Sequence, residues 1–147
     1  MGKNYYEPMH TAEHILNQVM ISQFTEERSF TTHIERKKSK VDYNFNRSLS
    51  REELEMIEKK VNSAINQNLD VKERFLDFNE ASKTFDLSRL PNDSKNKIRI
   101  IEIGNFDACP CIGQHVSNTS EIGKFKIVSS DFDGNKLRIR FKLVNDH

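Results

Sequence analysis

The 147-residue chain has no tryptophan, three prolines, five glycines and no run of 18 apolar residues. A transmembrane helix needs about 20 consecutive apolar residues, so none is predicted. The opening stretch MGKNYYEPMH lacks the apolar core of a secretory signal, and its Tyr6 departs from the pattern for N-myristoylation. We therefore expect a cytoplasmic protein without a membrane partner.

The chain has only two cysteines, Cys109 and Cys111, with one residue between them. A disulfide across so short a loop would be strained and would stabilise little. In a reducing compartment we expect free or metal-bound thiols.

Charge of one sign is not in excess, because the formal net charge is +1. No polyanionic partner is therefore required by the whole chain. Positive charge is nevertheless concentrated in IERKKSKV (34–41) and KLRIRFK (136–142), so nucleic acid is permitted as a partner. The length fits one domain, which we expect to span residues 1–147.

Hydrophobic spacing predicts two long helices. The first begins near Pro8 and has one apolar stripe, formed by Ile15, Leu16, Val19, Met20 and Phe24. The second begins at a capping box, Ser50 to Glu53, and ends at Asn66–Asn68. Its apolar face consists of Leu54, Ile57, Val61 and Ile65.

Strand patterns account for much of the rest. Short strands are predicted at 30–35, 40–45, 71–78 and 98–103, the last with both faces buried. A short helix capped by Asn79 is predicted at 79–85, and loops at 90–97 and 104–123. A final hairpin, FKIVSS and KLRIRFKLV, turns at Asp133-Gly134, with Leu137 and alternate residues facing one way and Lys136 and its alternates the other. The fold class is α+β: a mostly antiparallel sheet with two long helices packed on one face.

Two residue pairs predict a metal site. His10 and His14 are four apart, which places both imidazoles on one side of the first helix. Cys111 and His115 have the same spacing in a glycine-containing segment. Three nitrogens and one sulfur are ligands that Zn²⁺ prefers. Four closed protein ligands are typical of structural zinc, whereas a histidine-rich set is more typical of catalysis.

Glu13 offers an alternative. Residues 10–14, HTAEH, match the H-x-x-E-H pattern of inverzincin peptidases, in which the glutamate is the general base. That pattern needs a further ligand, normally a downstream carboxylate, and the sequence offers no compelling candidate. A solvent-exposed helix residue is the simpler interpretation of Glu13.

Four segments together resemble a known family. They are HTAEHIL (10–16), SREELEMIEKKVNSAINQNLDVKE (50–73), IRIIEIGNFDACPCIGQHV (98–116) and SEIGKFKIVSS (120–130). Their order and motifs are similar to the editing domain shared by alanyl- and threonyl-tRNA synthetases and by free-standing alanyl-tRNA editing proteins of the AlaX type. The resemblance covers nearly the whole chain and is closest to the free-standing type.

The resemblance implies zinc-dependent hydrolysis of misacylated tRNA in trans, with serine on tRNA(Ala) as the expected substrate. It implies His10, His14, Cys111 and His115 as zinc ligands. The partner would be the acceptor end of tRNA, with no DNA partner, and the oligomeric state is not indicated.

The remaining expected site residues include several at which the chain departs from its relatives, whereas Gly113 fits their motif. Glu13 stands where threonine is common, near the bound amino acid. With Gln114 it forms the expected catalytic pair, while Thr32, His33 and Gly113 are expected to bind substrate. Cys109 is an extra thiol, expected to be small and buried rather than a ligand.

Contact with RNA would have to come from the domain itself. The candidate side chains are Lys37, Lys38, Lys40, Arg138 and Arg140, although a solvated strand face is the more common role for each of them. Two functions of other classes stay open. One is a small zinc peptidase using Glu13, and the other is a zinc-stabilised RNA-binding module without catalysis.

Overall fold

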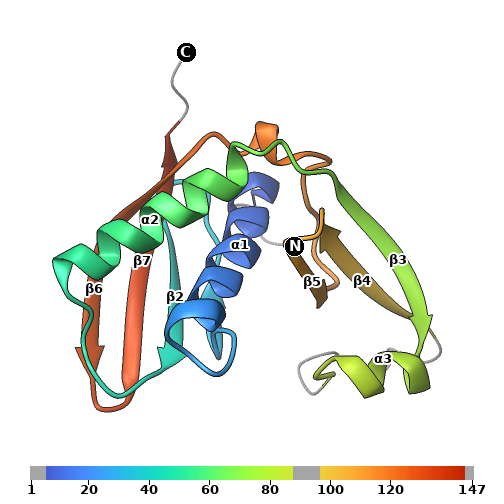
Figure 1. Ribbon diagram of the computed structural model, residues 1–147, viewed down its shortest axis with the longest axis horizontal. Coiled ribbons are helices and arrows are strands. Elements are labelled where there is room, and N and C mark those ends of the chain that lie inside the picture. Colours follow the sequence, from blue (N-terminus) through green and yellow to red (C-terminus); the bar gives the residue numbers. More distant parts are fainter. Residues whose placement is uncertain (1–5, 88–96, 145–147) are drawn as a thin grey trace.

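A computed structural model describes residues 6–87 and 97–144 (Figure 1). The helices are α1 (Glu7–Gln23), α2 (Arg51–Ile65), α3 (Phe78–Thr84) and the 3₁₀ turn η1 (Thr119–Glu121). The strands are β1 (Thr31–His33), β2 (Ser39–Asn44), β3 (Val71–Asp77), β4 (Lys97–Ile103), β5 (Asp107–Pro110), β6 (Lys124–Asp133) and β7 (Lys136–Val144). No helix in the described ranges combines the length and apolarity needed to span a bilayer.

The strands form two antiparallel sheets rather than the single sheet expected. One has the order β1-β2-β7-β6 and the other β3-β4-β5. Helices α1 and α2 lie on one face of the four-stranded sheet, while α3 lies beside the three-stranded sheet (Figure 1). The α+β class with two long helices on one face is confirmed, and the second sheet is the addition.

The main core lies between α1, α2 and the four-stranded sheet. Its fully buried side chains include Ile15, Leu16, Ile57, Val61, Ile139 and Phe141. The predicted alternation in β7 is confirmed, because Leu137, Ile139 and Phe141 are all buried. A smaller core beneath α3 contains Ala81, Ile98 and Ile100.

Helix α2 begins at the predicted capping box. The Ser50 hydroxyl accepts from the Glu53 N–H at 3.1 Å, and the Glu53 carboxylate accepts from the Ser50 N–H at 2.8 Å. Further along, Asn62 accepts from the Phe125 N–H at 2.8 Å and donates to the Phe125 carbonyl at 2.9 Å. Since β6 is an edge strand, these bonds cover backbone groups that another strand could otherwise pair with.

Three local predictions need correction. The N-cap of α3 is Asp77, not Asn79, and no side chain caps it. The predicted loop 104–123 contains strand β5 and turn η1. The final turn falls at Gly134–Asn135, one residue later than predicted, because Gly134 takes the positive φ of 63°.

In β4, Ile98 and Ile100 face one side and Ile101 and Ile103 the other, as expected for burial on both faces, although Arg99 and Glu102 between them are half-exposed. The predicted loop at 90–97 lies almost wholly outside the described residues.

Candidate metal centre

His10 and His14 lie on the first half of α1. Pro8 occupies the first turn, where its missing N–H costs no helical hydrogen bond. Every residue from Thr11 to Asn17 is buried, so this helix runs through the interior instead of lying on the surface. His14 is buried and His10 is half-buried, so neither ring lies fully exposed on the surface.

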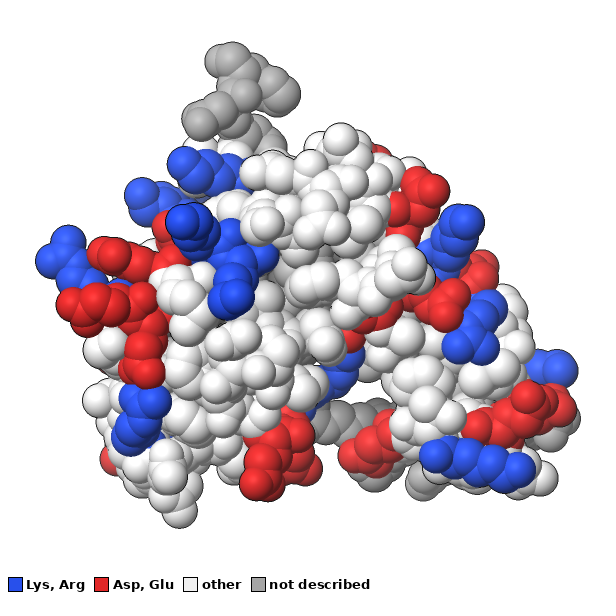
Figure 2. Space-filling view, viewed as in Figure 1, with Lys and Arg blue, Asp and Glu red and all other residues white. Residues whose placement is uncertain are grey.

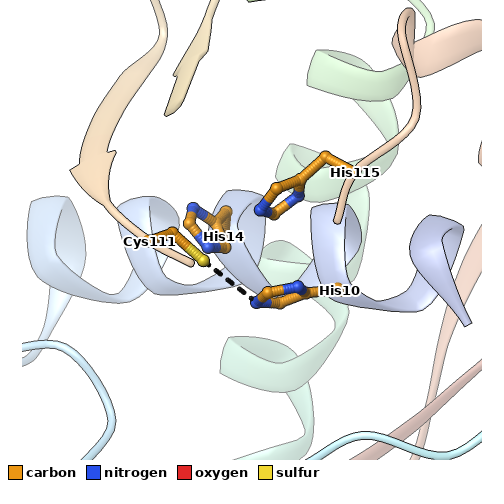
Figure 3. A group of neighbouring side chains, drawn as sticks. All are labelled: His10, His14, Cys111 and His115. Carbon is orange, nitrogen blue, oxygen red and sulfur yellow. Dashed lines mark hydrogen bonds between the residues drawn. The ribbon is translucent and has the colours of Figure 1, made fainter. Parts of the chain in front are cut away.

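Cys111 and His115 follow strand β5. Arg99 of β4 fixes this segment, because its guanidinium donates to the carbonyls of Cys111 at 3.1 Å and Gly113 at 2.6 Å. The Cys111 N–H donates in return to the Arg99 carbonyl at 3.2 Å. The chain is thereby held against the three-stranded sheet while its side chains point toward α1 (Figure 3).

The four predicted side chains meet at one point. One donor atom from each of His10, His14, Cys111 and His115 lies within 4.8 Å of the others. The Cys111 Sγ is 3.5 Å from His10 Nε2, and the His10 and His115 rings stack with centroids 4.3 Å apart (Figure 3). Such a group of nitrogen and sulfur donors could hold a metal ion.

The orientation of His115 fits a ligand. Thr11 Oγ1 donates its proton to the Glu7 carbonyl at 3.1 Å, so at 2.9 Å from His115 Nδ1 it acts as acceptor. This assigns the ring proton of His115 to Nδ1 and leaves the lone pair on Nε2. Nε2 is buried and makes no hydrogen bond with any described residue. An imidazole held in this way presents an unprotonated nitrogen to the cluster.

A carboxylate lies behind His14, near it but not hydrogen-bonded to it. Its Nδ1 lies 3.7 Å from Asp107 Oδ2, and Asp107 is itself hydrogen-bonded by Arg28. Burial alone would lower the pKa of His14, but the nearby Asp107, Cys111 and Glu13 outweigh it and raise the pKa to about 10. A carboxylate behind a histidine is a common arrangement at zinc centres, since it orients the ring and increases its basicity.

The two cysteines differ in chemistry. Burial favours the neutral thiol of Cys111, yet the neighbouring side chains of His10, His115 and His14 outweigh it and lower its pKa to about 3. Burial raises the pKa of Cys109 to about 12, and this residue lies outside the cluster. Cys111 is thus the thiolate that a metal would bind, whereas Cys109 is a protonated thiol.

Glu13 is buried, contrary to the simpler interpretation of an exposed helix residue. Its Oε1 lies 3.7 Å from His10 Nε2 and 3.9 Å from His14 Nε2. Its Oε2 accepts hydrogen bonds from Asn17 and, at 3.4 Å, from Thr32. One carboxylate oxygen is therefore fixed by the protein while the other faces the metal ligands.

The other expected substrate and catalytic residues differ in whether they lie near the metal centre. Thr32 reaches the Glu13 carboxylate and so borders the centre. His33 does not, because it pairs with Glu35 at 2.8 Å on the exposed side of β1. Gly113 is held by its carbonyl, and Gln114 is exposed beside it.

Several polar residues at the centre were not anticipated from the sequence. They are Thr11, Asn17, Arg28, Tyr43 and Asp107. For Asn17 a signal was present, because it follows Glu13 by four residues, and Thr11 precedes His14 by three. Arg28, Tyr43 and Asp107 come from other segments, and only the tertiary fold brings them to α1.

Comparison with known proteins supports one family. Residues 98–139 match the family model described as the threonyl and alanyl tRNA synthetase second additional domain. An alanine–tRNA ligase of Staphylothermus marinus is 40% identical over 96 residues, covering 64% of this chain and 11% of the ligase. That of Leptospira biflexa is 33% identical over 132 residues, covering 85% and 14%. That of Buchnera aphidicola is 32% identical over 133 residues, covering 88% and 15%.

The chain therefore corresponds to a small part of these relatives. It spans 11 to 15% of the length of the three ligases. Residues 98–139, which match the family model, include Cys111 and His115. The share of each ligase that the chain covers is too small for the activity of a whole ligase to be assigned to the chain.

Proposed function

We propose that this chain, which is related to the threonyl and alanyl tRNA synthetase second additional domain, hydrolyses the ester of misacylated tRNA in trans. The observation that carries the proposal is the convergence of three histidines and a thiolate around the buried Glu13. Since tRNA is charged in the cytoplasm, we place the activity there.

The donor set fits zinc. Three imidazoles and one thiolate are ligands of a borderline-soft tetrahedral ion; Thr11 orients the imidazole of His115, and Asp107 lies behind that of His14. When bound by His10, His14, Cys111 and His115, zinc would supply a Lewis acid that positions and polarises the substrate.

Glu13 is the proposed proton acceptor. Its free Oε1 faces the ligand histidines, where it can take the proton of a water that attacks the ester carbonyl carbon. The bond from that carbon to the ribose oxygen then breaks, and the proton passes to that oxygen, which becomes the ribose hydroxyl. The products are the amino acid and the deacylated RNA.

The other side chains are assigned to binding and positioning. Thr32 contacts Glu13 and would border the amino acid, whereas the exposed Gln114 would contact the reacting ester from the rim. Gly113 would let the substrate approach the backbone there. His33 is directed away from the centre, so we assign its expected substrate contact to RNA rather than to the amino acid.

A deacylation assay tests the proposal. Purified protein is incubated with radiolabelled Ser-, Gly- and Ala-tRNA(Ala) and with Ser-tRNA(Thr). We expect Ser-tRNA(Ala) to be hydrolysed fastest and Glu13→Gln to reduce kcat by ~10²-fold or more, the range for loss of a general base. Glu26→Gln, a matched change at an exposed position, should leave the rate unchanged. Absence of release from all four substrates would refute the proposal.

The two alternatives give different results. If all four side chains bound one zinc ion, no position would be left for substrate; such closed sets are typical of structural zinc, and this would favour the non-catalytic RNA-binding module. Retention of tRNA without release would support that module. Peptide cleavage that is lost in Glu13→Gln would support the peptidase.

A further inference from the structure

The outer face of the four-stranded sheet, opposite α1 and α2, is polar and unevenly charged. Side chains on this face alternate with the buried residues of β7. At one end lie six cations, which we call the basic end: Lys38, Lys40, Lys124, Lys126, Arg140 and Lys142. Figure 2 shows the molecule from the side of α2, on which cationic and acidic side chains are interspersed.

Acidic side chains lie toward the other end of this face. Asp42 is paired with Arg138, and Asp133 lies opposite Lys136. Asp131 reaches toward the basic end and pairs with Arg140. No ion pair joins any of the five lysines of the basic end to a carboxylate within the described residues. Among the described residues of this end, only Arg140 is held in an ion pair.

The register places like charges directly opposite each other. Lys126 faces Lys142 across β6 and β7, and Lys40 faces Arg140 across β2 and β7. Directly opposed like charges destabilise a sheet, whereas opposite charges there contribute roughly 0.2–1 kcal/mol. Folding alone gives no reason for two such pairs, so a bound polyanion is the simplest explanation of them.

The turn that precedes Lys38 and Lys40 contacts the start of α1, the helix that carries His10 and His14. Arg36, in the turn between β1 and β2, stacks on Tyr6 with its guanidinium carbon 4.6 Å from the ring centroid. The Tyr6 carbonyl accepts the N–H of His10 at 3.1 Å. Helix α1 thus begins beside the same end of the sheet at which β6 starts and β7 finishes (Figure 1).

We propose that the basic end binds the phosphate backbone of the acceptor stem of tRNA, so that the single-stranded 3′ end extends past Tyr6 to the metal centre. This proposal rests on the proposed function for its choice of RNA. Backbone phosphates suit clustered lysines on a nearly flat face, because such contacts need charge rather than base recognition. Arg138 is not part of this surface, because its guanidinium is held by two hydrogen bonds to the buried Asp42.

Direct binding tests the surface without requiring catalysis. The probe is an uncharged, fluorescently labelled RNA hairpin with an acceptor-type stem and a single-stranded 3′ end, titrated at several salt concentrations. For the variant Lys126→Glu with Lys142→Glu we expect Kd to rise ~10-fold or more and the slope of log K against log salt to fall by about 2. The control is Lys59→Glu with Lys60→Glu, exposed on α2, which changes the net charge equally and should leave Kd within about twofold.

A second measurement separates binding from folding. Lys126→Glu alone replaces a repulsive pair by an attractive one, so it should weaken RNA binding while leaving the midpoint of thermal unfolding unchanged or higher. Equal loss of RNA binding in the two double variants would overturn the proposal, as would binding of wild-type protein to phosphatidylserine vesicles but not to the hairpin. If the hairpin binds as expected and no aminoacyl-tRNA is hydrolysed, the proposed function fails and the surface stands.

Discussion

At the scale of single residues, Thr11 connects the helix backbone to the metal centre. Its hydroxyl donates to the Glu7 carbonyl and accepts from His115 Nδ1. Thr11→Val keeps the shape of the side chain but removes these two bonds and the one accepted from the Val116 N–H at 3.3 Å, so the tautomer of His115 is no longer fixed. We expect zinc affinity to fall ~10- to 100-fold, measured by competition with a chromophoric chelator. Thr11→Ser retains the hydroxyl and should bind zinc nearly as wild type; equal affinity in all three proteins would contradict this role.

Asp42 should contribute to stability in a pH-dependent way. Hydrogen bonds from Arg138 lower its pKa below the ordinary 3.8, against the opposing effect of burial. A group with a lowered pKa in the folded state stabilises above its unfolded pKa, and this contribution is lost as the pH falls through the folded value. Asp42→Asn should therefore reduce the free energy of unfolding by about 1–3 kcal/mol at neutral pH and by less in acid.

Urea unfolding at neutral pH and near pH 3 measures that difference. Asp131→Asn is the matched control, because Asp131 pairs with Arg140 from an exposed position. Its effect should stay within about 1 kcal/mol at either pH. A deficit in Asp42→Asn that is the same at both pH values would argue against a charge effect.

At the scale of elements, the capping box of α2 offers a test that leaves the metal centre untouched. Ser50→Ala removes the acceptor for the Glu53 N–H and should lower the free energy of unfolding by about 1 kcal/mol, with no change in zinc affinity. The Glu53 pKa is lowered to about 2 by Arg47 and by the Ser50 backbone. Its contribution should therefore be full above about pH 4.5 and fade toward pH 2. Ser50→Asp, which can also cap, should restore most of the loss; a loss that Ser50→Asp does not restore would exclude capping as its cause.

Elements with a strong local pattern were predictable from sequence. The stripe of α1, the capping box of α2 and the alternation in β7 each depend on residues a few positions apart, and all three are confirmed. Strand β5 was missed because its four residues show no alternation and end in Pro110, which suits an edge strand. The division into two sheets was also missed, since β2 pairs with the distant β7, and local periodicity does not specify a partner strand.

In the candidate site, too, the residues with a local sequence pattern were predictable and those joined by tertiary contacts were not. Its four donors were predicted because each pair shares a four-residue spacing, and the structure brings the pairs together. The residues around them were not, because Asp107 and Arg28 approach His14 from separate segments. Their roles depend on tertiary contacts that no spacing encodes.

At the scale of the whole molecule, metal removal should lower stability. Zinc at ~100 times its Kd would add about 2.7 kcal/mol to the free energy of unfolding, or roughly 5–10 °C in Tm. Calorimetry with zinc and with chelator measures this shift. It should be absent in His14→Ala and retained in His33→Ala, the matched histidine outside the cluster. A shift that persists in His14→Ala would place the metal elsewhere.

The distribution of the four donors along the chain also bears on how the protein is made. His10 and His14 are synthesised before Cys111 and His115, with residues 15–110 between the two pairs. Because closing so long a segment is entropically unfavourable, we expect the complete donor set to form only when β5 has packed against α1. Metal uptake would then be a late event in biogenesis, and a bound ion would mark a polypeptide whose folding is finished.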